Sequence, residues 1–231
     1  LSEKLNTDFE VLTKDYIGSE VFKEKYSNNY TQDWFIIYRN VTGAVNNRTT
    51  VATIIPKLPV VLSAYILKFE INHSFKEQTC FLANINSFVF DFVSRRKIGG
   101  SHLSVYVFDQ IPVIPPLIYT SKLLDKISAC VLRLTYTSKS LIQFALDLGY
   151  NEDPFRWDER ERFQLQCELD AIYAHLYGLE KEEMDYILET FPIVKRKDIA
   201  KYGSYRTKET ILQLYDEFAW VREEMKQQPN R

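Results

Sequence analysis

Residues 88–116 read FVFDFVSRRKIGGSHLSVYVFDQIPVIPP, and they join a helical pattern to a strand pattern. Apolar residues recur with helical spacing from Phe81 to Phe92, which predicts a helix over residues 81–97. A pair of glycines follows this helix. Alternating apolar residues at 103–108 then predict a strand, and the prolines beyond it exclude a helix. A helix followed directly by a strand indicates a mixed fold and not a helical bundle.

The turn between this helix and strand carries basic and polar side chains. They are Arg95, Arg96, Lys97, Ser101 and His102. The two glycines before Ser101 allow a tight turn because glycine tolerates positive φ angles. Cationic side chains and free backbone N–H groups can then face one concave place, which suits a polyanion.

Further strands are predicted upstream. Residues 34–39 and 49–55 are rich in aromatic and β-branched residues, which is typical of strands. Turn-forming residues at 43–47 predict that these two strands are antiparallel neighbours. Residues 60–71 predict another apolar strand. Residues 1–32 are polar, which predicts irregular chain with short helices.

The rest of the chain has helical patterns. The predicted helices are 121–134, 138–148, a run that begins at Asp158, 181–190 and about 206–226. Ser or Asp can cap several of these helices at the start, and glycines follow two of them. The predicted fold class is therefore α+β. It has a small mixed or antiparallel sheet with a packed helix in residues 1–118, and an all-helical part in residues 119–231.

Composition limits the class of protein. The chain has 231 residues, of which 45% are hydrophobic and 26% charged, as in ordinary globular proteins. It lacks the run of about 18–20 apolar residues that spans a membrane, so no membrane is expected as a partner. Its 3 cysteines are far apart and no signal pattern begins the chain, so a cytoplasmic location is predicted. The first residue is not Met, which suggests a fragment of a longer protein.

Patterns that carry catalysis are absent from the sequence. It contains no GxSxG, P-loop, GxGxxG or HExxH motif, and its histidines lie in separate segments. The acidic run at 180–185 begins a predicted helix, where carboxylates offset the positive end of the helix dipole. We therefore predict no catalytic residue and no metal site in this chain.

Charge is unevenly distributed along the chain. Residues 33–110 contain 8 Lys and Arg against 5 Asp and Glu, a net charge of +3. Residues 151–191 contain 4 against 12, a net charge of −8, and residues 192–231 contain 9 against 6, a net charge of +3. The acidic segment should avoid nucleic acid, whereas the first segment can tolerate it. A charge of +3 is also unremarkable for a segment of this length, so charge alone does not distinguish a nucleic-acid-binding segment from an ordinary one.

Two predicted loops carry the residue types of a DNA-binding surface. The first holds Arg39, Asn46, Arg48 and Thr49. The second is the turn at 95–102. Arg and Lys bind phosphates and guanine edges, whereas Asn, Ser and Thr bind adenine or phosphate. The same residue types fit a solvated loop equally well.

The quoted segment resembles a known family. SFVFDFVSRRKIGGSHLSVYVFDQIPVIPP is similar to the "NSFVFDF…GG.HLN…Q.PV.PP" stretch of large adenine-specific DNA methyltransferases. These include single-chain type II restriction–modification enzymes and phage-defence methylases with a TaqI-like C-terminal target-recognition region. YRNVTGAVNNRTTVATIIPK and ELDAIYAHLYGLEKEEMDYILETFPIVKRKDIAKYGSYRTKETIL also resemble the family, so the likeness runs from about Trp34 to Leu214.

The chain departs from the family pattern in the first loop. Asn40 stands where the family usually carries Asp, and Val45 and Asn47 replace a Thr and an acidic residue. The family's catalytic Asn/Asp-Pro-Pro-Tyr/Phe motif and S-adenosylmethionine loop do not occur here. The resemblance therefore implies the target-recognition portion without its catalytic domain. S-adenosylmethionine is implied for that missing domain, and no cofactor for this fragment.

We interpret the chain as a DNA sequence-recognition module whose partners are double-stranded DNA and the methyltransferase domain of the same parent chain. In this interpretation Arg39 and Arg48 approach base edges and 95–97 hold phosphates, with Ser101 and His102 as secondary contacts. One alternative is a protein-interaction module without direct DNA contact, and another is a nuclease. We expect the two loops to project from the same side of the molecule, close together. A position of Arg48 and residues 95–97 on opposite sides, or their burial in internal ion pairs, would overturn this interpretation.

Overall fold

The computed structural model describes residues 10–12, 32–61, 63–69 and 73–226. Its strands are β1 (Glu10–Leu12), β2 (Trp34–Arg39), β3 (Ala52–Pro56) and β4 (Ala64–Lys68). They form one sheet in the order β1-β4-β2-β3, and every neighbouring pair is antiparallel. The predicted α+β class is confirmed, as is the antiparallel pairing of β2 with β3.

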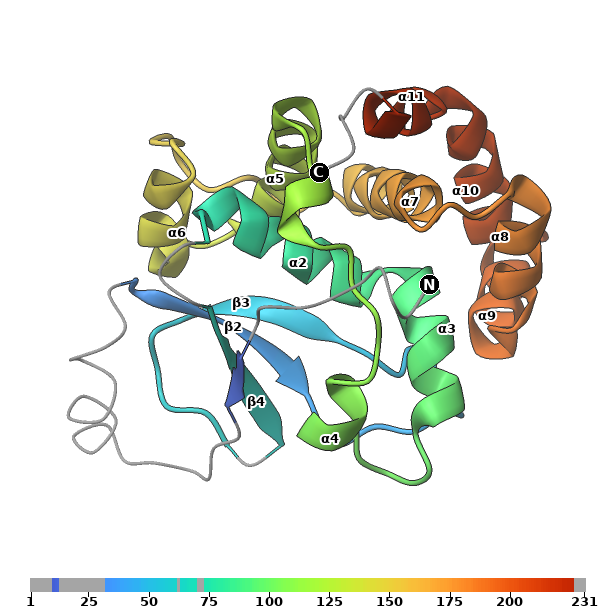
Figure 1. Cartoon of the computed structure of the whole chain (residues 1–231), viewed down its shortest axis with the longest axis horizontal. Helices are drawn as coiled ribbons and strands as arrows, with labels where there is room; N and C mark the ends of the chain where they lie inside the picture. The colour runs from blue at the N-terminus through green and yellow to red at the C-terminus, as the bar shows by residue number, and fades with distance from the viewer. Residues whose placement is uncertain (1–9, 13–31, 62, 70–72, 227–231) are drawn as a thin grey trace.

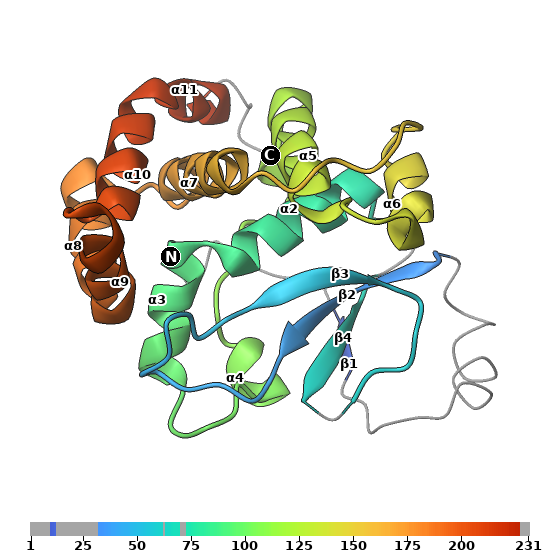
Figure 2. The same ribbon diagram turned by 180° about the vertical axis from the view of Figure 1, so that it is seen from behind.

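Most of the described chain is helical. The helices are α2 (Phe75–Asn86), α3 (Phe88–Lys97), α4 (Val105–Phe108), α5 (Ser121–Thr135), α6 (Ile142–Asp147), α7 (Glu159–Leu176), α8 (Lys181–Glu189), α9 (Pro192–Tyr202), α10 (Arg206–Glu217) and α11 (Trp220–Lys226). Helix α2 lies along one face of the sheet and α5 packs against α2, whereas α7 to α11 gather beyond α3 (Figures 1 and 2).

Strand β2 shows why the sheet forms where the sequence predicts it. Trp34, Ile36 and Tyr38 alternate along the strand and are buried against the helices. Phe35 points to the opposite face, where it packs with Val60 and Ile66 in a small second cluster. Side chains that alternate across a strand can bury both faces of the sheet in this way.

The helix predicted over residues 81–97 is two helices, so the prediction of one continuous helix is wrong. The chain is extended at Ser87, whose side chain accepts a hydrogen bond from the N–H of Phe90. Asp170 of α7 accepts from the N–H of Phe88 at 2.7 Å. Serine competes with the helical backbone for such bonds, and helical spacing alone does not register the competition.

The strand predicted over residues 103–108 is also wrong, because this segment contains helix α4. Ser104 caps the helix by accepting from the N–H of Val107. Strand β2 already has β3 on one side and β4 on the other. A strand at residues 103–108 would therefore find no free edge beside β2. The turn at 95–102 pairs with the chain after β2 only through an isolated bridge between Val41 and His102.

Downstream, most of the predicted helices are confirmed, with two differences. Helix α9 is absent from the prediction because Pro192 reads as a stop, although proline suits the first position of a helix. The helix predicted over 206–226 is interrupted between α10 and α11. The prediction for residues 1–32 lies mostly outside the described residues, which there include strand β1.

A single hydrophobic cluster crosses the predicted boundary at residue 118. It contains residues of β2, α2 and α3 together with residues of α5, α7 and α10. The division into a domain over residues 1–118 and a helical region over residues 119–231 stays a prediction. Within the described residues, the structure contains no helix that is both long enough and apolar enough to cross a membrane.

Asn86, the last residue of α2, completes the outer edge of strand β3. Its side-chain oxygen accepts from the N–H of Ala52 at 3.0 Å, and its side-chain nitrogen donates to the carbonyl of Ala52 at 3.0 Å. The amide thus makes the two bonds that a neighbouring strand would make.

Asn84 joins three segments that are far apart in the sequence. Its side-chain oxygen accepts from the N–H of Ile114 at 2.8 Å, and its nitrogen donates to the hydroxyl of Tyr177 at 2.7 Å. That hydroxyl donates in turn to the carbonyl of Pro112 at 2.8 Å. The proline-rich segment is therefore held to both α2 and the end of α7.

We predict that Asn84→Ala lowers the free energy of unfolding by about 2–4 kcal/mol, because it leaves the buried Ile114 N–H without a partner and removes the donor to the Tyr177 hydroxyl. Urea unfolding followed by circular dichroism measures this change. Asn151→Ala, at an exposed position, is the control and should change stability by less than about 0.5 kcal/mol. Equal stability of the two variants would contradict the role of Asn84.

Candidate nucleic-acid interface

The two loops predicted to bind DNA lie side by side. The N–H of Thr42 donates to the carbonyl of Ser101 at 2.9 Å, and the N–H of Leu103 donates to the carbonyl of Asn40 at 2.7 Å. We call residues 40–51 the first loop and residues 98–104 the second loop. In Figures 1 and 2 both leave the same end of the sheet, next to α3 and α4.

Asp91 of α3 holds the first loop against the helix. Its side chain is fully buried, and it accepts hydrogen bonds from the N–H of Thr49 at 3.0 and 3.1 Å and from that of Thr50 at 3.4 Å. Arg48 Nε donates to the same carboxylate at 2.5 Å. A buried carboxylate without such partners would be very costly. The end of the first loop is therefore fixed on α3.

Most of the Arg48 side chain is buried within the protein. Besides Asp91, its Nη2 donates to the carbonyl of Asn86. Its guanidinium carbon lies 4.1 Å from the centre of the Phe88 ring, in a cation–π contact. The side chain is 21% exposed. An internal ion pair at Arg48 is the arrangement that argues against its contacting DNA.

Arg95 also makes its contacts within the protein. Its Nη2 donates to the carbonyl of Asn46 at 2.5 Å and to that of Asn47 at 2.8 Å, so it ties α3 to the tip of the first loop. Its Nε lies 3.6 Å from Asp91, and its guanidinium carbon 4.2 Å from the centre of the Phe191 ring. With a side chain 11% exposed, Arg95 holds the loop in shape.

Two other predicted residues belong to this inner framework. Thr49 is fully buried, and its hydroxyl donates to the carbonyl of Gly43 at 3.2 Å. Asn46 is partly buried and donates to the hydroxyl of Thr42 at 3.2 Å. In this conformation Thr49 has no surface to offer a ligand.

The remaining predicted residues are exposed. Arg39 donates to the Thr42 hydroxyl at 3.3 Å, and Arg96 covers the Phe92 ring at 3.9 Å. Lys97 is exposed beside Gln110 at 3.5 Å. Within the described part of the chain, no carboxylate forms an ion pair with these three cations. Their charges therefore remain available to an anion.

Ser101 and His102 complete the exposed set at the second loop. Ser101 Oγ and His102 Nδ1 are 3.0 Å apart, and both residues are exposed. We call Arg39, Arg96, Lys97, Ser101 and His102 the outer set. The structure thus divides the nine predicted residues into an internal framework and an exposed outer set.

The sequence reasoning missed Asp91, which organises the framework. One signal was present, because Asp91 interrupts the apolar run FVFDFV and lies four residues before Arg95. An acid in an apolar helix face, with a base at that spacing, indicates a buried ion pair. Phe191 lacks such a local signal, since its contact with Arg95 joins residues that are distant in the sequence.

Comparisons of the chain with known protein families, with curated proteins and with solved structures found no match.

We predict that Arg48→Ala destabilises the fold by about 2–4 kcal/mol, because it leaves the buried Asp91 carboxylate with fewer partners. Lys97→Ala removes a cation of the same region that is exposed and is expected to change stability by less than about 0.5 kcal/mol. Thermal and urea unfolding of the two variants give the comparison. Equal stabilities would show that Asp91 does not depend on Arg48.

A second prediction concerns Asp170, whose pKa burial raises to about 6. The folded state then holds a proton between about pH 4 and 6 that the unfolded state releases, so this group stabilises the fold less as the pH rises through that window. Asp170→Asn keeps the acceptor for the Phe88 N–H but cannot titrate. The unfolding free energy of the parent, relative to that of Asp170→Asn, should fall by about 2–3 kcal/mol from pH 4 to pH 7. If the unfolding free energies of the two proteins change in parallel with pH, the raised pKa of Asp170 is refuted.

Proposed function

We propose that this chain is a DNA sequence-recognition module of an adenine-specific DNA methyltransferase or of a related restriction–modification or phage-defence enzyme. Its partners are double-stranded DNA and the methyltransferase domain of the same parent chain. S-adenosylmethionine belongs to that catalytic domain, and the module itself neither methylates nor cleaves DNA. The proposal rests on the sequence resemblance together with the arrangement of the two loops.

The observation that carries the proposal is the pairing of the first and second loops. Residues more than 50 positions apart come together through the Thr42–Ser101 and Leu103–Asn40 hydrogen bonds. Arg39 flanks the first loop, and Arg96 and Lys97 end α3 next to the second. Exposed cations beside paired loops are the kind of groups that bind a phosphate backbone.

The internal framework changes the roles assigned to individual residues. Arg48 and Arg95 support the loops from inside, so the proposed DNA contacts fall on the outer set. Arg39 is the candidate for a base edge, and Arg96 and Lys97 are the candidates for phosphates. Ser101 and His102 add hydrogen-bonding groups from the second loop. A surface with three cations should bind weakly and with strong dependence on salt.

The alternative is a docking module that contacts protein and not DNA. The internal hydrogen bonds of Arg48 and Arg95 favour this alternative, because they leave fewer cations free to contact DNA. Exposed apolar residues also favour it, and they include Ile142 and Leu146 of α6 at the other end of the molecule (Figure 1). The two functions make opposite predictions for a cation-to-alanine series.

We predict that the triple variant Arg39→Ala, Arg96→Ala and Lys97→Ala binds duplex DNA much more weakly while it keeps its fold. Each lost phosphate contact should reduce the slope of log K against log salt by about 1, so the triple variant should lose about 2–3. Fluorescence anisotropy with a labelled duplex over a range of salt concentrations measures the slope.

The control for this experiment is Lys139→Ala, since Lys139 is exposed and precedes α6. It should retain the parent's affinity and salt slope. If the parent does not bind duplex DNA, or if the triple variant binds as the parent does, the docking alternative is preferred. Arg48→Ala is unsuitable here because it alters the fold.

A further inference from the structure

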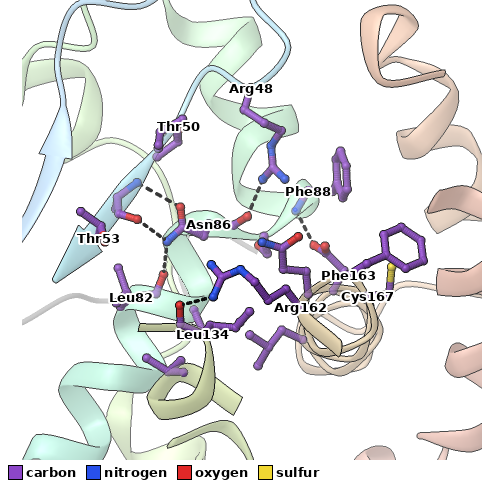
Figure 3. Close-up of a pocket in the computed structure, with 18 of the residues that line it drawn as sticks. Arg48, Thr50, Thr53, Leu82, Asn86, Phe88, Leu134, Arg162, Phe163 and Cys167 are labelled. Atoms are coloured by element: carbon purple, nitrogen blue, oxygen red, sulfur yellow. Dashed lines mark hydrogen bonds between the residues drawn. The ribbon is translucent and has the colours of Figure 1, made fainter. Parts of the chain in front are cut away.

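A pocket of 420 Å³ lies between the strand edge and the helical part of the molecule. One wall comes from β3 and from the junction of α2 with α3, and the opposite wall comes from α5 and α7 (Figure 3). This volume lies within the range of about 300–1,000 Å³ that is typical of small-molecule sites. Arg48 lines the pocket, but the outer set does not.

Two arginines reach the pocket from opposite walls. Figure 3 shows Arg48 entering from the first loop and Arg162 from α7. Arg162 Nη1 donates to the carbonyl of Leu134 at 2.7 Å, and its guanidinium carbon lies 3.6 Å from the centre of the Trp157 ring. These contacts fix the plane of the guanidinium. Among the described residues, Nε and Nη2 of Arg162 have no hydrogen-bond partner.

Asp170 of α7 lines the same pocket and is 6% exposed. Its Oδ1 accepts from the Phe88 N–H, and within the described chain its Oδ2 has no hydrogen-bond partner. Burial raises the pKa of this carboxyl to about 6, and nearby Arg48 offsets part of the shift. An asparagine would cap Phe88 equally well without the cost of a buried charge. The carboxylate is therefore explained better by a ligand than by the fold.

The rest of the lining combines hydrogen-bonding and apolar groups. Gln166 is exposed and lines the pocket, and its amide has no hydrogen-bond partner among the described residues. Phe88, Leu134, Phe163 and Val194 provide apolar surface. A few convergent polar groups in a largely apolar cavity is the usual composition of a small-molecule site.

Charge decides which ligand the pocket suits. Among the residues that line the pocket, Arg48 and Arg162 provide two positive charges and Asp170 provides one negative charge. The excess of one positive charge favours an anion, and a guanidinium can bind carboxylate and phosphate with two parallel hydrogen bonds. Asp170 Oδ2 is free to accept a hydrogen bond from a donor on the same ligand.

We propose that this pocket binds a small organic anion, in which a carboxylate or phosphate contacts Arg162 and a hydroxyl or amino group donates to Asp170. The apolar walls receive the body of the molecule. This site is separate from the proposed DNA surface, and it does not depend on that function.

Isothermal titration calorimetry with matched probes tests the proposal on the full chain. Adenosine 5′-monophosphate against adenosine tests the need for a phosphate. Phenylalanine against 3-phenylpropionate tests the need for an amino group beside a carboxylate. We expect at least one of the two anions that carry a donor group to bind about tenfold or more tightly than its counterpart. A difference in the first pair shows that the pocket binds the phosphate, and a difference in the second pair shows that a carboxylate ligand needs the adjacent amino group.

Two variants assign the binding to the pocket. Arg162→Gln should weaken the preferred probe about 10- to 100-fold, whereas Arg160→Gln, an exposed neighbour on α7, should leave it unchanged. If phenylalanine binds better than 3-phenylpropionate, Asp170→Asn should weaken the binding of phenylalanine but not that of 3-phenylpropionate. The proposal is overturned if neither anion binds better than its counterpart, or if Arg162→Gln binds as tightly as the parent with its fold intact.

Discussion

The buried carboxylate of Asp91 is the constraint on which the arrangement of the loops depends. It accepts hydrogen bonds from Arg48 and from the backbone N–H groups of Thr49 and Thr50, and it lies beside Arg95. A buried ion pair often adds little net stability, but removal of one partner is strongly unfavourable. The first loop therefore has one favourable position on α3. That position in turn brings the loop to the second loop, where backbone hydrogen bonds join the two.

The same network separates residues that look equivalent in the sequence. Arg95, Arg96 and Lys97 are consecutive, yet successive positions on a helix point in different directions. Arg95 turns inward to Asp91 and the first loop, whereas Arg96 and Lys97 remain exposed. Arg48 belongs to the framework of the loop and also lines the pocket. The loop surface and the pocket thus share a structural support, although their proposed ligands differ.

Residue patterns predicted the strands and most helices well because those elements are defined by local spacing. Strand β2 is a run of aromatic and β-branched residues, and α7 begins after Asp158, which caps it. Errors arose where a local pattern competed with tertiary structure. Residues 103–108 alternate as a strand does, but β2 has no free edge to pair with them. The candidate loops were predicted correctly as neighbours. The inward orientation of Arg95 has one local signal, which is Asp91 four residues before it. The orientation of Arg48 toward Asp91 and the contact of Arg95 with Phe191 join residues that are distant in the sequence, so local patterns do not predict them.

Asn86 has a consequence for how the molecule behaves in concentrated solution. Strand β3 is at the border of the sheet, and a bare border offers N–H and carbonyl groups to any extended peptide. The Asn86 amide occupies both groups of Ala52, so another chain cannot add a strand at that point. A single side chain thereby takes the place of a neighbouring strand at this one position of the border.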